Sequence, residues 1–312
     1  MTFDDINSFG KRREPFLFIS DFKAQNLKVI PLGKLEANDV EFCIDENYQV
    51  KEHVDFLEKN GVDFNEYKKK FDFVIEKIKA GETYLLNLTQ PSFIKTQLTL
   101  KEIFKCANAH YKLRYKDEFV CFSPEKFIQI SESKISTFPM KGTIDASIPN
   151  AKEIILRDQK EMAEHVMVVD LLRNDLSIVA KEVRVEDFRY VHEIDAGAKK
   201  LLHVSSHISG DVGSDWHQKI GDILNSLLPA GSISGAPKKS TLDIINQIEG
   251  YERGYFSGVF GVYDGKTFDS AVMIRFVQNS KDGYIYKSGG GITIDSDVKS
   301  EYDELLDKVY LP

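Results

Sequence analysis

The chain has 312 residues, of which 42% are hydrophobic, and a formal net charge of −8. This length and hydrophobic content are sufficient to bury a large core, in one big domain or two ordinary ones. The acidic balance, with a pI near 5.5, excludes nucleic-acid binding through a broad basic surface, because neutralising phosphates requires clustered Lys and Arg. Any anionic ligand is therefore expected in a local pocket.

The cysteines and the N-terminus indicate the cellular compartment. Cys43, Cys106 and Cys121 are widely spaced and form no CxxC motif, so neither a disulfide framework nor a thiolate zinc site is indicated. The first 13 residues lack an apolar stretch, and no apolar run approaches the ~18 residues of a membrane span. We expect an unprocessed, soluble protein of the reducing cytosol.

The pattern of apolar residues predicts a mixture of strands and helices. Short apolar runs bounded by turn-forming residues predict strands at residues 15–21, 27–32, 83–88, 119–122, 126–130, 134–138, 258–263, 270–277 and 284–288. Apolar residues at helical spacing predict helices at 67–79, 158–172, 239–248 and 298–309. No repeat or linker divides the chain, so we expect one α+β domain over residues 1–312.

Lys141 lies in Thr137-Phe-Pro-Met-Lys-Gly-Thr143, between Pro139 and Gly142. These neighbours predict a turn just beyond a strand. A lysine on a turn can direct its amine at a ligand, whereas most lysines lie on solvated faces.

Two glutamate pairs share the spacing i, i+3 on predicted helices. Glu161 and Glu164 belong to the first pair, and Glu301 and Glu304 to the second. Each pair projects from one side of its helix, so the two helices can bring oxygen ligands to one hard cation, and Mg²⁺ takes only one or two carboxylates. Such pairs are also common on solvated helices, where Glu161 pairs with Lys160 and Glu301 with Lys299 or Lys308.

Several other segments carry candidate binding or catalytic groups. The run Gly231-Ser-Ile-Ser-Gly-Ala-Pro-Lys238 precedes a predicted helix, and free N–H groups at a helix start bind carboxylates; it is otherwise an ordinary capping loop. Arg275 interrupts an apolar strand and needs an anion or a structural partner such as Asp269. Glu125 is a general acid if burial raises its pKa. His203 resembles a core histidine and is retained as a third catalytic candidate.

Taken in order, these segments resemble the chorismate-utilising enzymes, over roughly residues 15–309. The motifs that carry the resemblance are Gly81-Glu-Thr-Tyr-Leu-Leu-Asn-Leu-Thr89, Ser123-Pro-Glu125, Pro139-Met-Lys-Gly-Thr143, Ala163-Glu-His-Val-Met-Val-Val-Asp-Leu-Leu-Arg-Asn-Asp175, the 231–238 run and residues 289–308. The resemblance implies a two-sheet β-sandwich flanked by helices, with a shortened N-terminal region (about residues 1–66) packed on the catalytic domain.

The resemblance also implies a Mg²⁺-dependent reaction of chorismate. Glu164 and Glu304 would be the leading metal ligands, with Glu161 and Glu301 helping directly or through water. The groups implied to hold the substrate are Gly142, Thr143, Ser234, Gly235, Ala236, Lys238, Arg275, Gly290 and Lys308.

Within the family, Lys141 decides the implied reaction. Members that make 4-amino-4-deoxychorismate commonly have Lys in this Pro-x-x-Gly-Thr motif, where anthranilate synthases commonly have Ala. The Lys141 amine would attack the ring at C2 as the C4 hydroxyl leaves with a proton from Glu125, and ammonia would then enter at C4 and expel the lysine. The attacking amine must be neutral, which requires a lowered pKa. Water-adding relatives carry a Lys base where Leu85 stands here, so that branch is disfavoured.

The chain departs from its relatives in three features, and it lacks a cysteine suited to glutamine hydrolysis. Val262 stands where relatives usually carry a Tyr that holds substrate, and Tyr263 is its possible substitute; Met140 replaces the usual Ile. The short N-terminal region implies no tryptophan regulation. No cysteine lies in a nucleophile elbow suited to glutamine hydrolysis, so a separate glutamine amidotransferase subunit would supply ammonia. The alternatives are an anthranilate synthase component and a catalytically idle chorismate-binding subunit.

Overall fold

The computed structural model describes residues 1–44, 58–195 and 200–311, and its strands form two antiparallel sheets. The first sheet contains β1 (Phe16–Ser20), β2 (Leu27–Pro31), β8 (Lys126–Ser131), β9 (Lys134–Thr137), β10 (Met140–Asp145), β11 (Lys181–Asp195), β12 (Lys200–Asp211), β14 (Val259–Tyr263) and β15 (Phe268–Val272). The second contains β3 (Val40–Ile44), β4 (Glu58–Asn60), β5 (Leu85–Lys95), β6 (Tyr111–Tyr115), β7 (Phe119–Ser123), β13 (Gly235–Ala236), β16 (Phe276–Ser280) and β17 (Gly283–Ile292).

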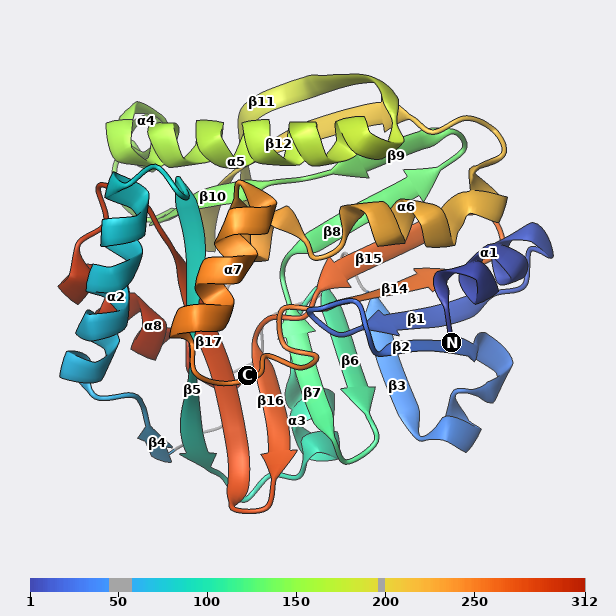
Figure 1. Ribbon diagram of the computed structural model, residues 1–312, viewed down its shortest axis with the longest axis horizontal. Helices are drawn as coiled ribbons and strands as arrows, with labels where there is room; N and C mark the ends of the chain where they lie inside the picture. The colour runs from blue at the N-terminus through green and yellow to red at the C-terminus, as the bar shows by residue number, and fades with distance from the viewer. Residues whose placement is uncertain (45–57, 196–199, 312) are drawn as a thin grey trace.

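Strands that are distant in sequence are neighbours in both sheets. The order is β10-β12-β9-β8-β15-β14-β1-β2 in the first sheet, with β11 on β12, and β13-β5-β17-β16-β7-β6-β3 in the second, with β4 on β5. Strands from before residue 66 therefore contribute to both sheets. The predicted α+β class is confirmed (Figure 1).

Strand β1 shows why the sheets pack as layers. Its five residues are all buried, and they alternate between two cores. Phe16 and Phe18 face the helical layer around Trp216, whereas Leu17 and Ile19 face the second sheet. Successive side chains of a strand point to opposite faces, so an unbroken apolar run suits a strand that is covered on both sides.

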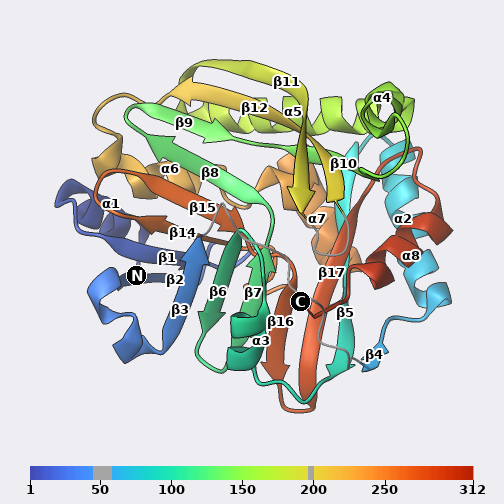
Figure 2. The same ribbon diagram turned by 180° about the vertical axis from the view of Figure 1, so that it is seen from behind.

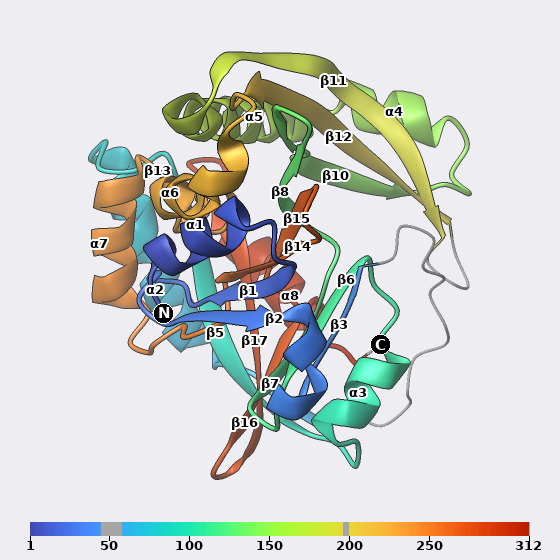
Figure 3. The same ribbon diagram turned by 90° about the vertical axis from the view of Figure 1, so that its right-hand side faces the viewer.

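The helices lie outside the two sheets. They are α1 (Phe3–Lys11), α2 (Phe64–Lys79), α3 (Leu100–Cys106), α4 (Ala151–Arg157), α5 (Gln159–Val179), α6 (Ile220–Leu227), α7 (Lys238–Ile248) and α8 (Val298–Asp307). Helices α5 and α6 run along the first sheet, and α2, α7 and α8 stand beside β5 and β17 (Figure 1). Helix α3 packs on β6 and β7 (Figure 2). In the edge view, β11 and β12 form the outer layer beside α5 (Figure 3).

Two predictions about these elements are wrong, and a third is right but gives too short a strand. Residues 270–277 do not form one strand, because β15 ends at Val272 in the first sheet and β16 begins at Phe276 in the second. The strand predicted at 284–288 continues through the glycines to Ile292. Lys141 does not lie on a turn but at the start of β10. In each case long-range strand pairing overrides the local pattern.

Candidate active site

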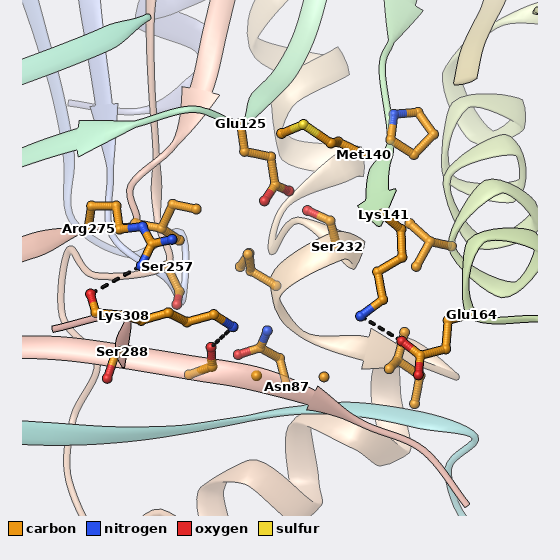
Figure 4. A pocket seen from close by; sticks show the side chains of 18 of the residues that line it. Asn87, Glu125, Met140, Lys141, Glu164, Ser232, Ser257, Arg275, Ser288 and Lys308 are labelled. Atoms are coloured by element: carbon orange, nitrogen blue, oxygen red, sulfur yellow. Dashed lines mark hydrogen bonds and ion pairs between the residues drawn. The ribbon is translucent and has the colours of Figure 1, made fainter. Parts of the chain in front are cut away.

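A cavity of about 210 Å³ opens between the two sheets. Its walls are the start of β10, the middle of α5, the ends of β5 and β17, and the segments 256–257 and 274–275 (Figure 4). The lining combines apolar surface with a few charged groups, which is typical of sites for small ligands. The charged residues that line it are Glu125, Lys141, Glu164, Arg275, Lys287 and Lys308.

A β-bulge aims Lys141 into this cavity. Met140 pairs with Ser205 and Thr143 pairs with His203, and the register shifts between these two pairs. Gly142 inside the bulge has a φ of +99°, a conformation that favours glycine. Bulges bend a strand and redirect its side chains. The Lys141 ammonium thereby reaches Glu164, with 2.6 Å between Nζ and Oε2 (Figure 4).

This ion pair determines the protonation of Lys141. Burial favours the neutral amine, but Glu164 and the carboxylates behind it outweigh burial and raise the pKa of Lys141 above its ordinary value. The lowered pKa that nucleophilic attack requires is therefore not found for Lys141 in the protein alone. Lys141 is held as an ammonium.

The first glutamate pair lies where α5 meets β10. Asp158 caps the helix by accepting a hydrogen bond from the Glu161 N–H at 2.9 Å. Glu164 is buried, and its other oxygen lies 3.9 Å from Lys160 Nζ. Glu161 Oε2 is buried without a hydrogen-bond partner among the described residues. Burial raises the pKa of Glu161, helped by the charge of Glu164.

The second pair lies on α8. Glu301 is buried and accepts a hydrogen bond from Ser296 Oγ at 2.8 Å, yet burial still raises its pKa. Glu304 is exposed and pairs with Lys308 at 2.7 Å. Burial raises the pKa of Glu304, but the Lys308 ammonium outweighs it and the net shift is downward. On a solvated helix, Glu161 was expected to pair with Lys160, and Glu301 with Lys299 or Lys308. Among the described residues, neither glutamate forms such an ion pair.

Both glutamate pairs have a carboxylate oxygen that lies close to a glycine. A Cβ at Gly142 would lie 3.3 Å from Glu161 Oε2, and a Cβ at Gly290 would lie 3.3 Å from Glu301 Oε2. Two glycines thus lie close to two acidic oxygens that a larger residue would crowd, and one of these oxygens is unpartnered in the described residues. Among residues 1–44, 58–195 and 200–311, no three His, Cys, Asp or Glu side chains converge as a complete ligand set. Carboxylate oxygens are of the ligand type that Mg²⁺ takes, and this ion completes its shell with water or substrate oxygens.

Glu125 stands on the cavity wall away from Glu164 (Figure 4). It precedes β8, and Ser123 Oγ accepts a hydrogen bond from its backbone N–H at 3.1 Å. Burial raises the pKa of Glu125, while Ser232 and Lys308 oppose the rise only partly. Glu125 was expected to be a general acid only if burial raises its pKa, and burial does so. A raised pKa keeps the carboxyl protonated nearer to neutral pH.

Arg275 lies where the chain crosses from the first sheet to the second. Its φ is +50°, and its Nη1 donates to the Lys308 carbonyl at 3.1 Å. Asp269, the alternative partner, instead accepts from the Tyr111 hydroxyl at 2.9 Å and lies 3.5 Å from Lys126. Within the described chain Arg275 forms no ion pair, so its guanidinium can accept an anion in the cavity.

Other predicted site residues lie outside the cavity lining. Ser234 is fully buried and donates to the Ala230 carbonyl at 2.8 Å, while Gly235 and Ala236 form β13 against β5. Lys238 lies 3.3 Å from Asp175. The structure therefore brings Ser232 and Ile233 of this run to the cavity instead, because strand pairing turns the later residues away.

The remaining predicted residues lie on β10, β12 and β14, outside the cavity lining. Gly142 and Thr143 are not in the lining, and Thr143 is exposed. His203 Nδ1 lies 2.9 Å from Met140 Sδ, and burial with His192 lowers the pKa of His203 to about 4. Val262 and Tyr263 also lie outside the lining, and the Tyr263 hydroxyl lies 2.7 Å from His217 Nδ1. Tyr263 therefore does not take the place of the family's substrate-binding Tyr.

Many lining residues were not among the predicted site residues, and Asn87, Ser232 and Ser257 are three examples. Asn87 shares a face of β5 with Leu85, so period-two alternation could have identified it. Ser232 lies within the Gly-rich run, two residues before Ser234, the first residue of the run that was predicted to bind substrate. Ser257 has a φ of +61°, which no local pattern signals.

The chain is similar in sequence to a known protein family and to several known proteins. A family model described as chorismate binding enzyme matches residues 26–311. An "Uncharacterized PabA-like protein" of Haemophilus influenzae is 45% identical over 314 residues, covering 99% of this chain and 95% of the relative. No helix in the described part of the chain is long and apolar enough to span a membrane.

Two longer relatives carry different activities in their names. Aminodeoxychorismate synthase component 1 of Salmonella typhimurium is 32% identical over 260 residues, covering 78% of this chain and 56% of the relative. Anthranilate synthase component 1 of Synechocystis is 40% identical over 168 residues, covering 50% and 31%. This chain thus corresponds to about half or less of these relatives.

The fold has a clear counterpart among solved structures. The menaquinone-specific isochorismate synthase of Escherichia coli superposes with a TM-score of 0.73 at 15% identity, covering 97% of this chain and 79% of that one. At this identity the likeness concerns the fold alone. It confirms the predicted two-sheet architecture.

Proposed function

Because this chain belongs to the family of chorismate binding enzymes, we propose that it aminates chorismate at C4, as aminodeoxychorismate synthase component 1. The product is 4-amino-4-deoxychorismate, a precursor of p-aminobenzoate and folate. The observation that carries the proposal is Lys141, whose amine enters the cavity that Glu125 also lines. Relatives named for this activity and for anthranilate synthesis both match the chain, so overall identity does not choose between them.

The roles of the side chains follow from their positions. The neutral Lys141 amine attacks C2 of chorismate, both conjugated ring double bonds shift (C1=C2 to C1=C6 and C5=C6 to C4=C5), and the C4 hydroxyl leaves as water with the proton of Glu125. Ammonia then adds at C4 and the C2–N bond to Lys141 breaks, which returns the lysine. A nucleophile and an acid on one cavity are what this two-step substitution requires.

Cations and a metal would offset the charge of a dianionic substrate. Arg275 and Lys308 stand together at one wall and would hold one carboxylate. Glu164 and Glu304, with Glu161 and Glu301, would hold Mg²⁺, which would screen the other carboxylate. Burying a carboxylate is costly without such partners.

Ammonia would come from a separate glutamine amidotransferase subunit. Cys121 is buried in the core between the sheets, and burial raises the pKa of its thiol. Neither Cys43 nor Cys106 lines the cavity. Free ammonium salt should therefore replace the partner in a test.

The test incubates the purified chain with chorismate, Mg²⁺ and ammonium salt and separates the products by mass-resolved chromatography, with and without a lyase. Aminodeoxychorismate, converted by the lyase to p-aminobenzoate, supports the proposal. Anthranilate overturns it in favour of the second candidate, which the Synechocystis relative favours. Chorismate binding without turnover in the presence of an amidotransferase indicates an idle subunit.

The Lys141→Ala variant tests the covalent step. It should lose C4 amination by at least about 10³-fold and form no chorismate adduct in intact-mass spectra. Lys160→Ala is the matched control, because Lys160 is on the same helix as Glu164 but does not line the cavity. A Lys141→Ala enzyme that still aminates at the wild-type rate excludes lysine as the nucleophile.

A further inference from the structure

Lys141 and Glu164 form an ion pair, and the functional meaning given to this pair rests on the proposed function. Lys141 Nζ lies 2.6 Å from Glu164 Oε2. The proposed function gives these groups different tasks, one as nucleophile and the other as metal ligand. A Mg²⁺ ligand lies about 2.0–2.1 Å from the ion. An ammonium and a metal ion therefore cannot occupy the same side of this oxygen.

The surroundings of the pair are suited to a cation other than lysine. Glu161 Oε2, on the same helix, is buried and has no hydrogen-bond partner in the described residues. Gly142, the residue next to Lys141, adds no side chain beside this oxygen, where a Cβ would lie 3.3 Å from it and 3.3 Å from Ile155 Cδ1. Lys141 pairs with Glu164 and leaves the Glu161 oxygen without a hydrogen bond among the described residues. One cation bound between the two carboxylates would satisfy both.

The position of the amine in this pair does not suit nucleophilic attack. Lys141 extends toward Glu164, whereas Glu125 and Ser232 stand elsewhere on the cavity wall (Figure 4). An amine bound to a carboxylate as an ammonium has no free electron pair. The amine must leave Glu164 before it can attack a substrate.

We propose that Lys141 and the metal ion bind Glu164 alternately. In the metal-free protein Lys141 serves as the cation of the site, and metal binding displaces its amine into the cavity. The displaced ammonium can then give its extra proton to water, so the nucleophile forms only in the metal-loaded enzyme, which prevents attack on a substrate whose charge is not yet compensated.

Calorimetric titration of Mg²⁺ in the absence of chorismate tests the exclusion directly. Lys141→Met removes the competing ammonium and should tighten Mg²⁺ binding by at least about tenfold, because nearby unit charges interact strongly in a partly buried site. Lys160→Met is the matched control. Its ammonium lies 3.9 Å from Glu164 Oε1 on an exposed side chain, so its removal should change the affinity by about twofold or less.

A second measurement uses the wild-type protein and does not depend on the folding of a variant. Trace acetylation with acetic anhydride, followed by peptide mass spectrometry, reports the accessibility of each amine. Mg²⁺ should increase the labelling of Lys141 severalfold. Lys238 is the internal reference, because it lies 3.3 Å from Asp175 and outside the cavity lining, and its labelling should not change.

The outcomes separate this inference from the proposed function. Equal Mg²⁺ affinity of wild type and Lys141→Met, including no binding by either, overturns the inference, as does Lys141 labelling that Mg²⁺ leaves unchanged or reduces. Neither measurement involves chorismate or a product. If the enzyme forms anthranilate but shows both effects of Mg²⁺, the proposed function is refuted. The inference that Lys141 and the metal ion exclude each other at Glu164 then still holds.

Discussion

Arg275 donates a hydrogen bond from Nη1 to the backbone carbonyl of Lys308 at 3.1 Å. The contact joins the crossover between the sheets to the residue after α8, and it places two cations at one wall of the cavity. The Lys308 ammonium is held in turn by the Gly289 carbonyl at 2.9 Å and by Glu304. A rigid pair of cations suits a carboxylate ligand.

Replacing Arg275 should weaken substrate binding. Arg275→Gln removes a charge-assisted hydrogen bond worth about 1.5–3 kcal/mol, so KM for chorismate should rise by at least about tenfold. Initial rates over a range of chorismate concentrations give KM and kcat separately. Arg184→Gln is the control, because Arg184 is exposed and pairs with Glu186 on β11. An unchanged KM in Arg275→Gln would remove Arg275 from the binding site.

Glu125→Gln should affect turnover more than binding. The amide keeps the shape of the carboxyl but is not an acid, so kcat should fall by about 10²–10⁴-fold with little change in KM. Wild-type kcat should decline as pH rises through the elevated pKa of Glu125, because the acid form is then lost. This alkaline decline should be absent from Glu125→Gln. Exposed Glu118→Gln should keep the wild-type profile, and the same profile in both variants would contradict the assignment.

Gly290→Ala tests the space beside the second glutamate pair. The added methyl would lie 3.3 Å from Glu301 Oε2 and 3.8 Å from Lys308 Nζ, so the carboxylate cannot approach a bound cation freely. Mg²⁺ affinity should fall by about tenfold in calorimetry, with the thermal midpoint nearly unchanged. Gly33→Ala is the control, because no atom lies within 4 Å of its added Cβ. Unaltered Mg²⁺ binding by Gly290→Ala would argue against Glu301 as a ligand.

His217 should make the fold sensitive to mild acid. Burial lowers the pKa of His217 to about 4, below its usual value near 6.5. Its stabilising contribution is therefore complete above pH 6.5 and is lost as pH falls toward 4, since the unfolded chain takes up the proton first. Between pH 7 and pH 5 this amounts to about 2 kcal/mol.

Urea unfolding at both pH values measures this loss. His217→Gln should reduce the difference in unfolding free energy between pH 7 and pH 5 by about 2 kcal/mol relative to wild type. His207→Gln, a half-buried histidine in β12, is the comparison. If His217→Gln retains the full wild-type difference, the proton is taken up elsewhere.

Some features of the site follow from local pattern alone. The spacing of Glu161 and Glu164, and of Glu301 and Glu304, places each pair on one side of a helix whatever the rest of the fold does. The helices were identifiable because their apolar residues repeat at helical spacing and because Asp158 and Asp297 cap them. Glu125 was identifiable from its motif, although only burial raises its pKa.

Other features depend on partners far away in the chain. The break at Arg275 and the extension of β17 are set by which strands pair in which sheet. Gly235 and Ala236 were predicted to bind substrate, and they pair with β5 instead. Local propensity contains no information about these partners.

The sequence by itself determined the α+β class, the family resemblance and most of the charged residues of the site, because these depend on residue type and short-range spacing. The tertiary structure alone decided where Lys141 points. A bulge opposite β12, with Gly142 at positive φ, turns its amine toward Glu164. That contact joins a strand of one sheet to a helix that covers it, and the resulting charge balance holds the amine as an ammonium. Such a balance arises only from distances between groups that the fold brings together.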